Sequence, residues 1–318
     1  MTALRIGVVG VGYLGRFHAE KYAGSGAVEL IGVVDADKER ARQIAEQFGT
    51  AWFSDPVHLI GKVDAVSIVA PTVHHHAIAK LFLDQGIHVL LEKPMTVTVE
   101  QADELVSIAE AKKCVLQVGH IERFNPAVTA LLNLVLQVKH LHAERAAPFT
   151  VRCTDVSVVL DLMIHDLDIV MKLAGTRPVA VSAAGAAVIT DRIDMASARI
   201  LFENGCVADV VASRVSDEKK RMLRIVEPSK VYLADYQTQQ ATVFERDTNP
   251  SLGLTARPIK TEKRDTLADE IRAFLECIRT GARPVVSGVD GRRALALATV
   301  IENSILAGKT EFVQISAL

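Results

Sequence analysis

Two patterns of hydrophobic and polar residues divide the chain near Gly119. Before that residue, short uninterrupted apolar runs alternate with polar segments of helical length. Uninterrupted apolar runs indicate strands buried on both faces, as in a parallel sheet with helices on either side. The predicted strands are Arg5–Val9, Val28–Val34, Ala51–Phe53, Ala65–Ala70, His88–Leu91 and Cys114–Val118, and the predicted helices are Tyr13–Ala23, Asp37–Phe48, His74–Gln85 and Val99–Lys112. Right-handed crossovers between such strands predict a doubly wound α/β domain over residues 1–120.

Beyond Gly119, longer strand-like segments follow one another with short polar turns, which is typical of a mostly antiparallel sheet. The predicted strands are Ala180–Val188, Ala196–Phe202, Cys206–Val211, Met222–Val226 and Val231–Tyr236, and the predicted helices are Pro126–Leu136, Asp161–Leu173, Thr266–Thr280 and Asp290–Leu306. Residues 121–318 are therefore expected to form an α+β domain with a large open sheet. The late helices are candidates for packing back on the first domain.

The composition limits the class of protein. The chain has 318 residues, of which 49% are hydrophobic and 23% are charged, so two globular domains with large cores are expected. A net charge of -2 gives no basic excess for nucleic acid, and no apolar run of about 20 residues predicts a membrane span. The four cysteines form no CxxC pair, and the N-terminus does not resemble a signal peptide. Reduced thiols and a cytoplasmic location are the expectation.

The segment GVGYLG, residues 10–15, carries the first chemical signal. It follows a predicted strand and opens a predicted helix, and Asp35 lies 20 residues later at the end of the second strand. This context matches the Rossmann dinucleotide fingerprint, in which the helix N-terminus binds the pyrophosphate and the acidic residue binds the adenosine ribose. A carboxylate at Asp35 repels a 2′-phosphate, so NAD is expected rather than NADP. The cofactor-binding residues predicted here are Gly10, Gly12, Tyr13, Leu14, Gly15 and Asp35.

Polar residues also follow strands four and five, at the carboxyl edge where ligands bind in such sheets. Lys93 follows an apolar strand directly, and a lysine in a partly desolvated cleft can exchange protons near neutrality. The alternative is an ordinary surface lysine. The histidine run 74–76 does not predict a metal site, because adjacent side chains diverge; it marks either a helix start or a contribution to the cofactor pocket. The further cofactor-binding candidates at this edge are Ala70, Pro71, His75, Glu92 and Lys93.

The segment LDLMIHDLDIV supplies the second group of candidates. Helical spacing places Asp161, His165 and Asp168 on one face, where Asp161 can orient substrate hydroxyls and His165 can act as a proton partner. The alternatives are an N-cap aspartate with a satisfied histidine, or half of a zinc site. Arg123 and Asn125 follow strand six, where they either contact substrate or hold the domain junction.

Together these segments resemble the glucose–fructose oxidoreductase / inositol dehydrogenase / MocA family across the whole chain. The matching pieces are GVVGVGYLGRFHA with Asp35, APTVHHHAIA, LLEKP and DLMIHDLD. The resemblance implies a Rossmann domain followed by an α/β domain whose open sheet supports a homo-oligomer, as a dimer or tetramer. It also implies catalytic roles for Lys93, Asp161 and His165, and a place for His75 beside the cofactor. Thr72 stands where members commonly have Asn, which affects fine substrate geometry.

A narrower resemblance is to the UDP-N-acetylglucosamine 3-dehydrogenases of lipid A biosynthesis, through VGHIERFNPAV, TDVSVVLDLMIHDLDIV and RPVVSGVDGRRAL. It implies oxidation at C3 by NAD, with Lys93 or His165 taking the hydroxyl proton. Separately, no metal site is expected. Inositol or free-sugar dehydrogenases, NAD-dependent glycosidases and a nucleotide-sensing regulator remain alternatives. The residues that this resemblance offers to the diphosphate or uridine are Arg123, Asn125, Arg152 and Arg214.

Overall fold

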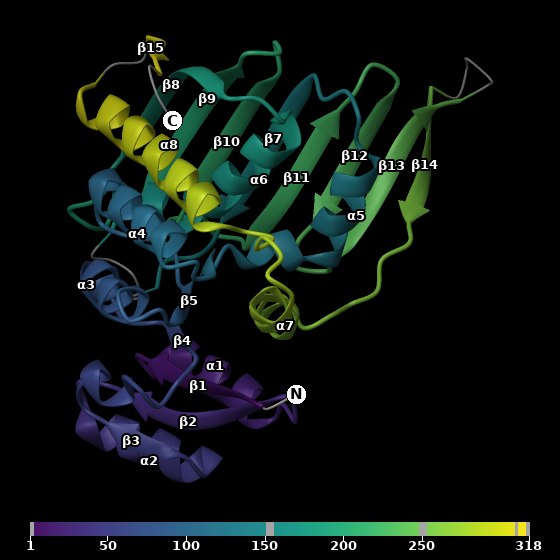
Figure 1. Ribbon diagram of the computed structural model, residues 1–318. Coiled ribbons are helices and arrows are strands. Elements are labelled where there is room, and N and C mark those ends of the chain that lie inside the picture. The colour runs from purple at the N-terminus through teal and green to yellow at the C-terminus, as the bar shows by residue number, and fades with distance from the viewer. Residues whose placement is uncertain (1–2, 151–155, 248–252, 309–310, 316–318) are drawn as a thin grey trace. The chain divides into compact units, whose positions relative to one another are not determined.

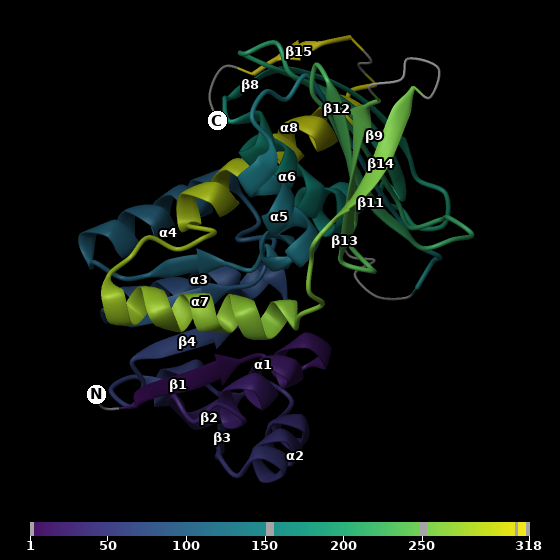
Figure 2. The same ribbon diagram turned by 90° about the vertical axis from the view of Figure 1, so that its right-hand side faces the viewer.

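A computed structural model describes residues 3–150, 156–247, 253–308 and 311–315. The chain divides into two compact units, which are described separately. Unit 1 comprises residues 1–120 and 267–292, and unit 2 comprises residues 121–266 and 293–318. Figures 1 and 2 show both units in two orientations.

Unit 1 is built on a six-stranded parallel sheet in the order β3-β2-β1-β4-β5-β6. The strands are β1 (Leu4–Val9), β2 (Val28–Val34), β3 (Ala51–Phe53), β4 (Ala65–Ile68), β5 (His88–Leu91) and β6 (Leu116–Val118). The central strands β4 and β5 are buried along nearly their whole length, which explains their uninterrupted apolar sequences. The strand order reverses between β1 and β4, and this reversal creates the crevice in which such sheets bind ligands.

The helices of unit 1 are α1 (Tyr13–Ala23), α2 (Lys38–Phe48), the short 3₁₀ helix η1 (Pro56–Leu59), α3 (Thr72–Leu83), α4 (Val99–Ala111) and nearly all of α7 (Thr266–Thr280). Local sequence fixes several of their ends. Asp37 caps α2 by accepting a hydrogen bond from the Arg40 N–H, and Thr98 and Gln101 form a reciprocal capping box on α4. Helix α7 is attached to β6, because the Gln117 side chain donates to the Glu270 carbonyl.

Unit 2 contains a nine-stranded mixed sheet in the order β14-β13-β12-β11-β7-β10-β9-β8-β15. The strands are β7 (His140–Ala146), β8 (Pro178–Ala186), β9 (Met195–Phe202), β10 (Val207–Ser213), β11 (Lys220–Val226), β12 (Lys230–Asp235), β13 (Gln240–Arg246), β14 (Leu254–Ile259) and β15 (Val313–Gln314). All neighbouring strands are antiparallel except β7 and β10, which run parallel at the centre. The sheet is thus mostly antiparallel, as the sequence predicts.

One face of this sheet carries the core of unit 2. Figures 1 and 2 show α5 (Pro126–Leu134) and α6 (Ile164–Ala174) against the same face. The short helix η2 (Ile121–Phe124) precedes α5, and η3 (Val159–Met163), a π-helix, leads directly into α6. Helix α8 (Gly288–Leu306) begins in unit 1, and its later turns add apolar residues to the core of unit 2.

Two features of unit 2 depart from the sequence expectation. Strands β7, β13 and β14 were not predicted, because charged residues interrupt their apolar alternation; β7, for example, reads HLHAERA and buries Arg145. The single helix expected over Asp161–Leu173 is instead a π-helix followed by α6. Among the described residues, no helix is long and apolar enough to cross a membrane.

Candidate active-site residues

The turn between β1 and α1 has the geometry of a pyrophosphate cradle. Gly10 has a φ of +84°, and a Cβ there would lie 2.6 Å from the Ala70 nitrogen. A Cβ at Gly15 would lie 1.8 Å from the Gly10 carbonyl oxygen, so only glycine lets α1 start this close to β1. A Cβ at Gly12 would meet nothing within 4 Å, so the backbone at the N-terminus of α1 faces open space. This arrangement fits a bound dinucleotide, and the side chains of Tyr13 and Leu14 are exposed beside it.

Asp35 lies directly after β2, next to this turn. Its carboxylate accepts hydrogen bonds from the N–H groups of Val11 and Asp37, each at 3.0 Å. Arg40 lies 3.4 Å from both Asp35 oxygens and also binds Asp37. The carboxylate is therefore fixed beside the glycine turn, in the place required for binding ribose hydroxyls, and Arg40 partly offsets its charge.

His75 contacts both of the segments predicted at the carboxyl edge of the sheet, the one after β4 and the one after β5. Its Nε2 lies 2.7 Å from the carbonyl oxygen of Ala70, and its Nδ1 lies 2.9 Å from that of Pro94. Burial lowers the pKa of His75, although both carbonyls oppose this effect. The side chain is buried, and Pro71 begins α3 nearby as its N-cap residue. His75 therefore connects the backbone after β4 to the backbone that follows Lys93.

Glu92 and Lys93 follow β5, and their side chains differ in exposure. Lys93 is half-buried, whereas the Glu92 carboxylate is buried, 3.4 Å from the His18 Nε2, and accepts the Lys93 N–H at 3.2 Å. A Cβ at Gly119 would lie 2.8 Å from this carboxylate. Burial alone would raise the pKa of Glu92, but the nearby His18 imidazole and the Lys93 charge hold it below its ordinary value. The Lys93–Pro94 peptide bond is cis.

In unit 2, Asp161 lies in the π-helix η3, and His165 lies in the first turn of α6. Both side chains are half-buried. π-Helical turns inside helices are frequent at functional sites. Asp168, which the predicted helical spacing groups with them, is instead buried, and its two oxygens accept hydrogen bonds from Arg123 at 2.6 and 3.0 Å.

The structure places Arg123 and Asn125 inside unit 2. The Arg123 guanidinium is 5% exposed and makes the bidentate pair with Asp168. Asn125 caps α5 through the Ala127 N–H, and its amide donates to the Tyr236 carbonyl and to the Glu122 carboxylate. These contacts give both residues a structural role within unit 2, where the sequence offered either a substrate contact or a role at the domain junction.

A second buried cluster was missed by sequence reasoning. Arg145 on β7 donates to Asp166 at 2.7 and 3.2 Å and to Glu122 at 2.9 Å, and its guanidinium lies over the Tyr236 ring. Burial raises the pKa of Asp166, although Arg145 opposes this effect. Arg221 lies opposite Arg145 in the register of β11, and its guanidinium lies 3.9 Å from the Glu122 carboxylate. In the sequence, the cluster was indicated only by charged residues, such as Arg145 and Asp166, that interrupt otherwise apolar segments.

Arg214 is also buried. Its Nη2 donates to the Val156 carbonyl at 2.7 Å, and its Nε lies 3.8 Å from Asp194. Asp194 accepts the backbone N–H groups of residues 188–190, after β8, whereas Arg214 holds the Val156 carbonyl shortly before η3. Arg152 lies outside the described residues.

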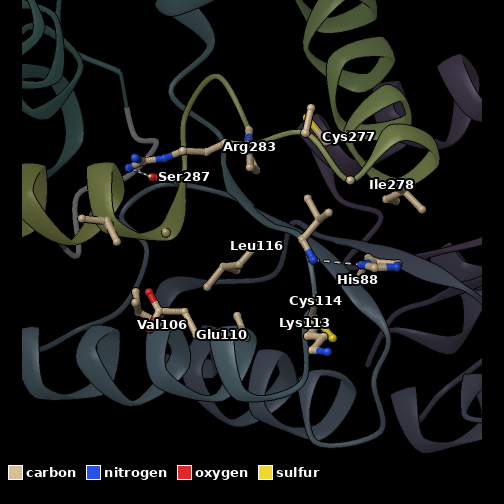
Figure 3. A pocket seen from close by; sticks show the side chains of 17 residues that line it. His88, Val106, Glu110, Lys113, Cys114, Leu116, Cys277, Ile278, Arg283 and Ser287 are labelled. Carbon is tan, nitrogen blue, oxygen red and sulfur yellow. Dashed lines mark hydrogen bonds between the residues drawn. The ribbon is translucent and has the colours of Figure 1, made fainter.

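Unit 1 also contains a pocket of about 610 Å³ that does not include the candidate residues described above. Figure 3 shows the side chains that line it. It is lined by the amino ends of β5 and β6 and by the C-terminal ends of α4 and α7, including Cys114 and Cys277. Ligands of doubly wound sheets bind at the opposite, carboxyl edge. Burial raises the pKa of both thiols, which disfavours their thiolate forms. Among the described residues, no group of three or more His, Cys, Asp or Glu side chains is arranged to hold a metal ion.

Two family models match the chain. Residues 4–120 match an oxidoreductase family described as having an NAD-binding Rossmann fold, and residues 136–228 match the GFO/IDH/MocA C-terminal domain.

Individual relatives cover nearly the whole chain. A UDP-N-acetylglucosamine 3-dehydrogenase from Acidithiobacillus ferrooxidans is 41% identical over 96% of this chain and 98% of its own length. A solved structure of that enzyme superposes with a TM-score of 0.91, covering 96% of this chain and 99% of its own. A scyllo-inositol 2-dehydrogenase from Bacillus subtilis is 26% identical over 96% of this chain and 95% of its own length.

Proposed function

Because the chain belongs to the glucose–fructose oxidoreductase / inositol dehydrogenase / MocA family of NAD-binding oxidoreductases, we propose that it oxidises the C3 hydroxyl of UDP-N-acetylglucosamine to a ketone. The observation that carries this proposal is the 41% identity to a UDP-N-acetylglucosamine 3-dehydrogenase over nearly the full length of both chains. Two relatives named as inositol dehydrogenases are 26% and 28% identical over 96% and 95% of this chain, so an inositol is the second candidate substrate.

NAD is held by unit 1. The N–H groups at the start of α1 bind the pyrophosphate where Gly12 leaves the backbone open, and Asp35 binds the adenosine ribose. Bound NAD supplies the acceptor for the hydride that leaves the substrate carbon. Asp35 and Asp37 together repel a 2′-phosphate more strongly than the single cation of Arg40 attracts it.

Three residues are assigned to proton transfer from the substrate or to binding its hydroxyls. Lys93 or His165 takes the proton as the alcohol becomes a ketone, and Asp161 accepts hydrogen bonds from neighbouring sugar hydroxyls. The buried ion pair of Arg123 leaves it unsuited to the diphosphate. Arg152, which lies outside the described residues, and the partly exposed Arg221 are the better candidates.

We further propose that the protein is cytoplasmic, acts in lipid A biosynthesis and forms a homo-oligomer through unit 2. In the described residues of that unit, α5 and α6 cover one face of the sheet (Figures 1 and 2). The other face presents charged and apolar side chains, including the Arg199–Asp209 pair. A surface of this kind suits a second copy of the chain.

The decisive test mixes purified protein with NAD and UDP-N-acetylglucosamine, with an aminotransferase and amino donor present to remove the ketone. NADH that forms only in the presence of the UDP-sugar supports the proposal. Absence of NADH, while NAD binding is measured directly, rejects the substrate assignment. Inositols, free sugars and glycosides are then tested in parallel, and a glycosidase is distinguished by product release without net NADH.

A further inference from the structure

Glu270 is a buried acid that the proposed reaction does not use. It lies on α7 with no exposed surface, among apolar neighbours on the same helix such as Ile271 and Phe274. Neither oxygen of its carboxyl has a hydrogen-bond partner within the described part of the chain. Its backbone carbonyl accepts the Gln117 side chain at 3.1 Å, which ties this turn of α7 to β6. A carboxyl in such a place costs stability that an apolar residue of similar volume would not.

The charged and titratable groups around Glu270 come from two other elements. Glu92, after β5, is the carboxylate that acts on it electrostatically. From α1, Tyr22 is fully buried, hydrogen-bonds Ser67 at 2.7 Å and is itself influenced by Glu270, and His18 approaches Glu92. No cation approaches Glu270 within ion-pair distance in the described residues, which distinguishes it from Glu92.

Of the two carboxyls, only Glu92 has polar partners that stabilise its negative charge. Glu92 has the His18 imidazole and the Lys93 N–H, and Glu270 has neither. Burial, and then the Glu92 charge, raise the pKa of Glu270 well above its ordinary value, whereas the pKa of Glu92 is lowered. Two like charges in a common buried environment cannot both be retained at low cost.

We propose that Glu270 remains protonated at neutral pH, so that the two carboxyls carry one negative charge, held on Glu92, which positions His18 and the backbone of Lys93. Glu270 is thus a positioning residue that acts through Glu92 and Lys93. The positioning role of Glu270 rests on the proposed catalytic role of Lys93, whereas its protonation does not. Ionisation of Glu270 in alkali would add a second buried negative charge and displace Glu92 from its partners.

Infrared difference spectroscopy on the full-length protein tests the protonation state without any substrate. The spectrum of the wild type minus Glu270→Gln should show the C=O stretch of a protonated carboxyl at neutral pH. The matched control is Glu276→Gln, which alters an exposed residue of the same helix and should remove only an ionised carboxylate band. An ionised band in the Glu270 difference would overturn the proposal.

A second variant keeps the test valid if Glu270→Gln does not fold. Glu92→Gln removes the neighbouring charge, so the protonated-carboxyl band of Glu270 should titrate at lower pH than in the wild type. An unchanged titration would show that Glu92 does not control Glu270 and would reject the shared-charge model.

The positioning role is tested by the pH dependence of kcat. If ionisation of Glu270 disturbs Lys93, the ratio of alkaline to neutral kcat should rise by about tenfold in Glu270→Gln, equivalent to one unit of pH along a titration limb. The Glu276→Gln control should keep the wild-type ratio. An unchanged ratio in Glu270→Gln would assign Glu270 no role in catalysis. If the wild type shows no activity with the UDP-sugar, the proposed function is rejected, but the infrared result on the protonation of Glu270 still holds.

Discussion

The buried pair of Arg123 and Asp168 allows a structural role to be separated from substrate binding. Replacing Arg123 by Met leaves the Asp168 carboxylate, which is 2% exposed, without its two charge-assisted hydrogen bonds. Breaking a buried pair in this way costs about 3–5 kcal/mol. For a unit of this size, about 2–4 °C of melting temperature is lost per kcal/mol, so Arg123→Met should melt about 6–20 °C lower.

The double variant Arg123→Met/Asp168→Leu removes both charges and supplies apolar volume, so it should recover most of this loss. Thermal unfolding followed by circular dichroism measures both effects. Arg177→Met, which breaks an exposed pair with Glu203, is the matched control and should cost about 0–1 kcal/mol. A wild-type melting temperature for Arg123→Met, combined with a raised KM for the UDP-sugar, would refute the structural role.

Further predictions concern the cofactor, the proposed catalytic role of Lys93 and one loop. Lys93→Ala should lower kcat by about 10²–10⁴-fold while the Kd for NAD, measured by calorimetry, stays near the wild-type value; loss of NAD binding would make Lys93 a cofactor residue. Asp35→Ala should raise kcat/KM with NADP relative to NAD, because the remaining cation of Arg40 then faces the 2′-phosphate; an unchanged ratio removes Asp35 from the ribose site. Asp194→Asn should destabilise the protein by about 1–3 kcal/mol in denaturant titrations. Burial alone would raise the pKa of Asp194, but hydrogen bonds from the N–H groups of residues 188–190 outweigh burial and lower it. The ionised carboxylate therefore stabilises the folded protein at neutral pH, and this stabilisation is lost only as the pH falls through the depressed pKa. Equal losses for Asp194→Asn at neutral and strongly acidic pH would contradict this assignment.

The fold was predictable where burial is uniform. Strands β4 and β5 are covered on both faces and read as uninterrupted apolar runs, so their position and parallel arrangement followed from hydrophobicity alone. The glycine turn was predictable because steric limits at Gly10 and Gly15 leave no other residue type. Strand β7 was not predictable in this way, because the ion pairs that allow Arg145 to be buried involve residues 21–23 positions away in the sequence.

The candidate site was predictable as a set of segments, but not as a set of roles. In LDLMIHDLD, regular helical spacing groups Asp161 with Asp168, whereas the π-helix η3 changes the phase before α6 begins. Whether a π-turn forms depends on tertiary packing, and the spacing of residues in the sequence does not encode it. Asp161 and His165 consequently remain half-buried. Asp166 and Asp168 instead form buried ion pairs with Arg145 and Arg123.

This division suggests how the charged residues of both units are used. In unit 2, Arg123 and Arg145 each neutralise buried carboxylates, so these arginines stabilise the segments that carry Asp161 and His165. In unit 1, Glu92 has a comparable supporting position, since it holds the Lys93 backbone while the lysine side chain stays half-buried. A charged residue beside the proposed catalytic residues therefore need not contact substrate, because it can instead stabilise the segment that carries them. Burial and hydrogen-bond partners distinguish the two, so Arg221, which is partly exposed and lies 3.9 Å from Glu122, is a better candidate for contacting substrate than either buried arginine.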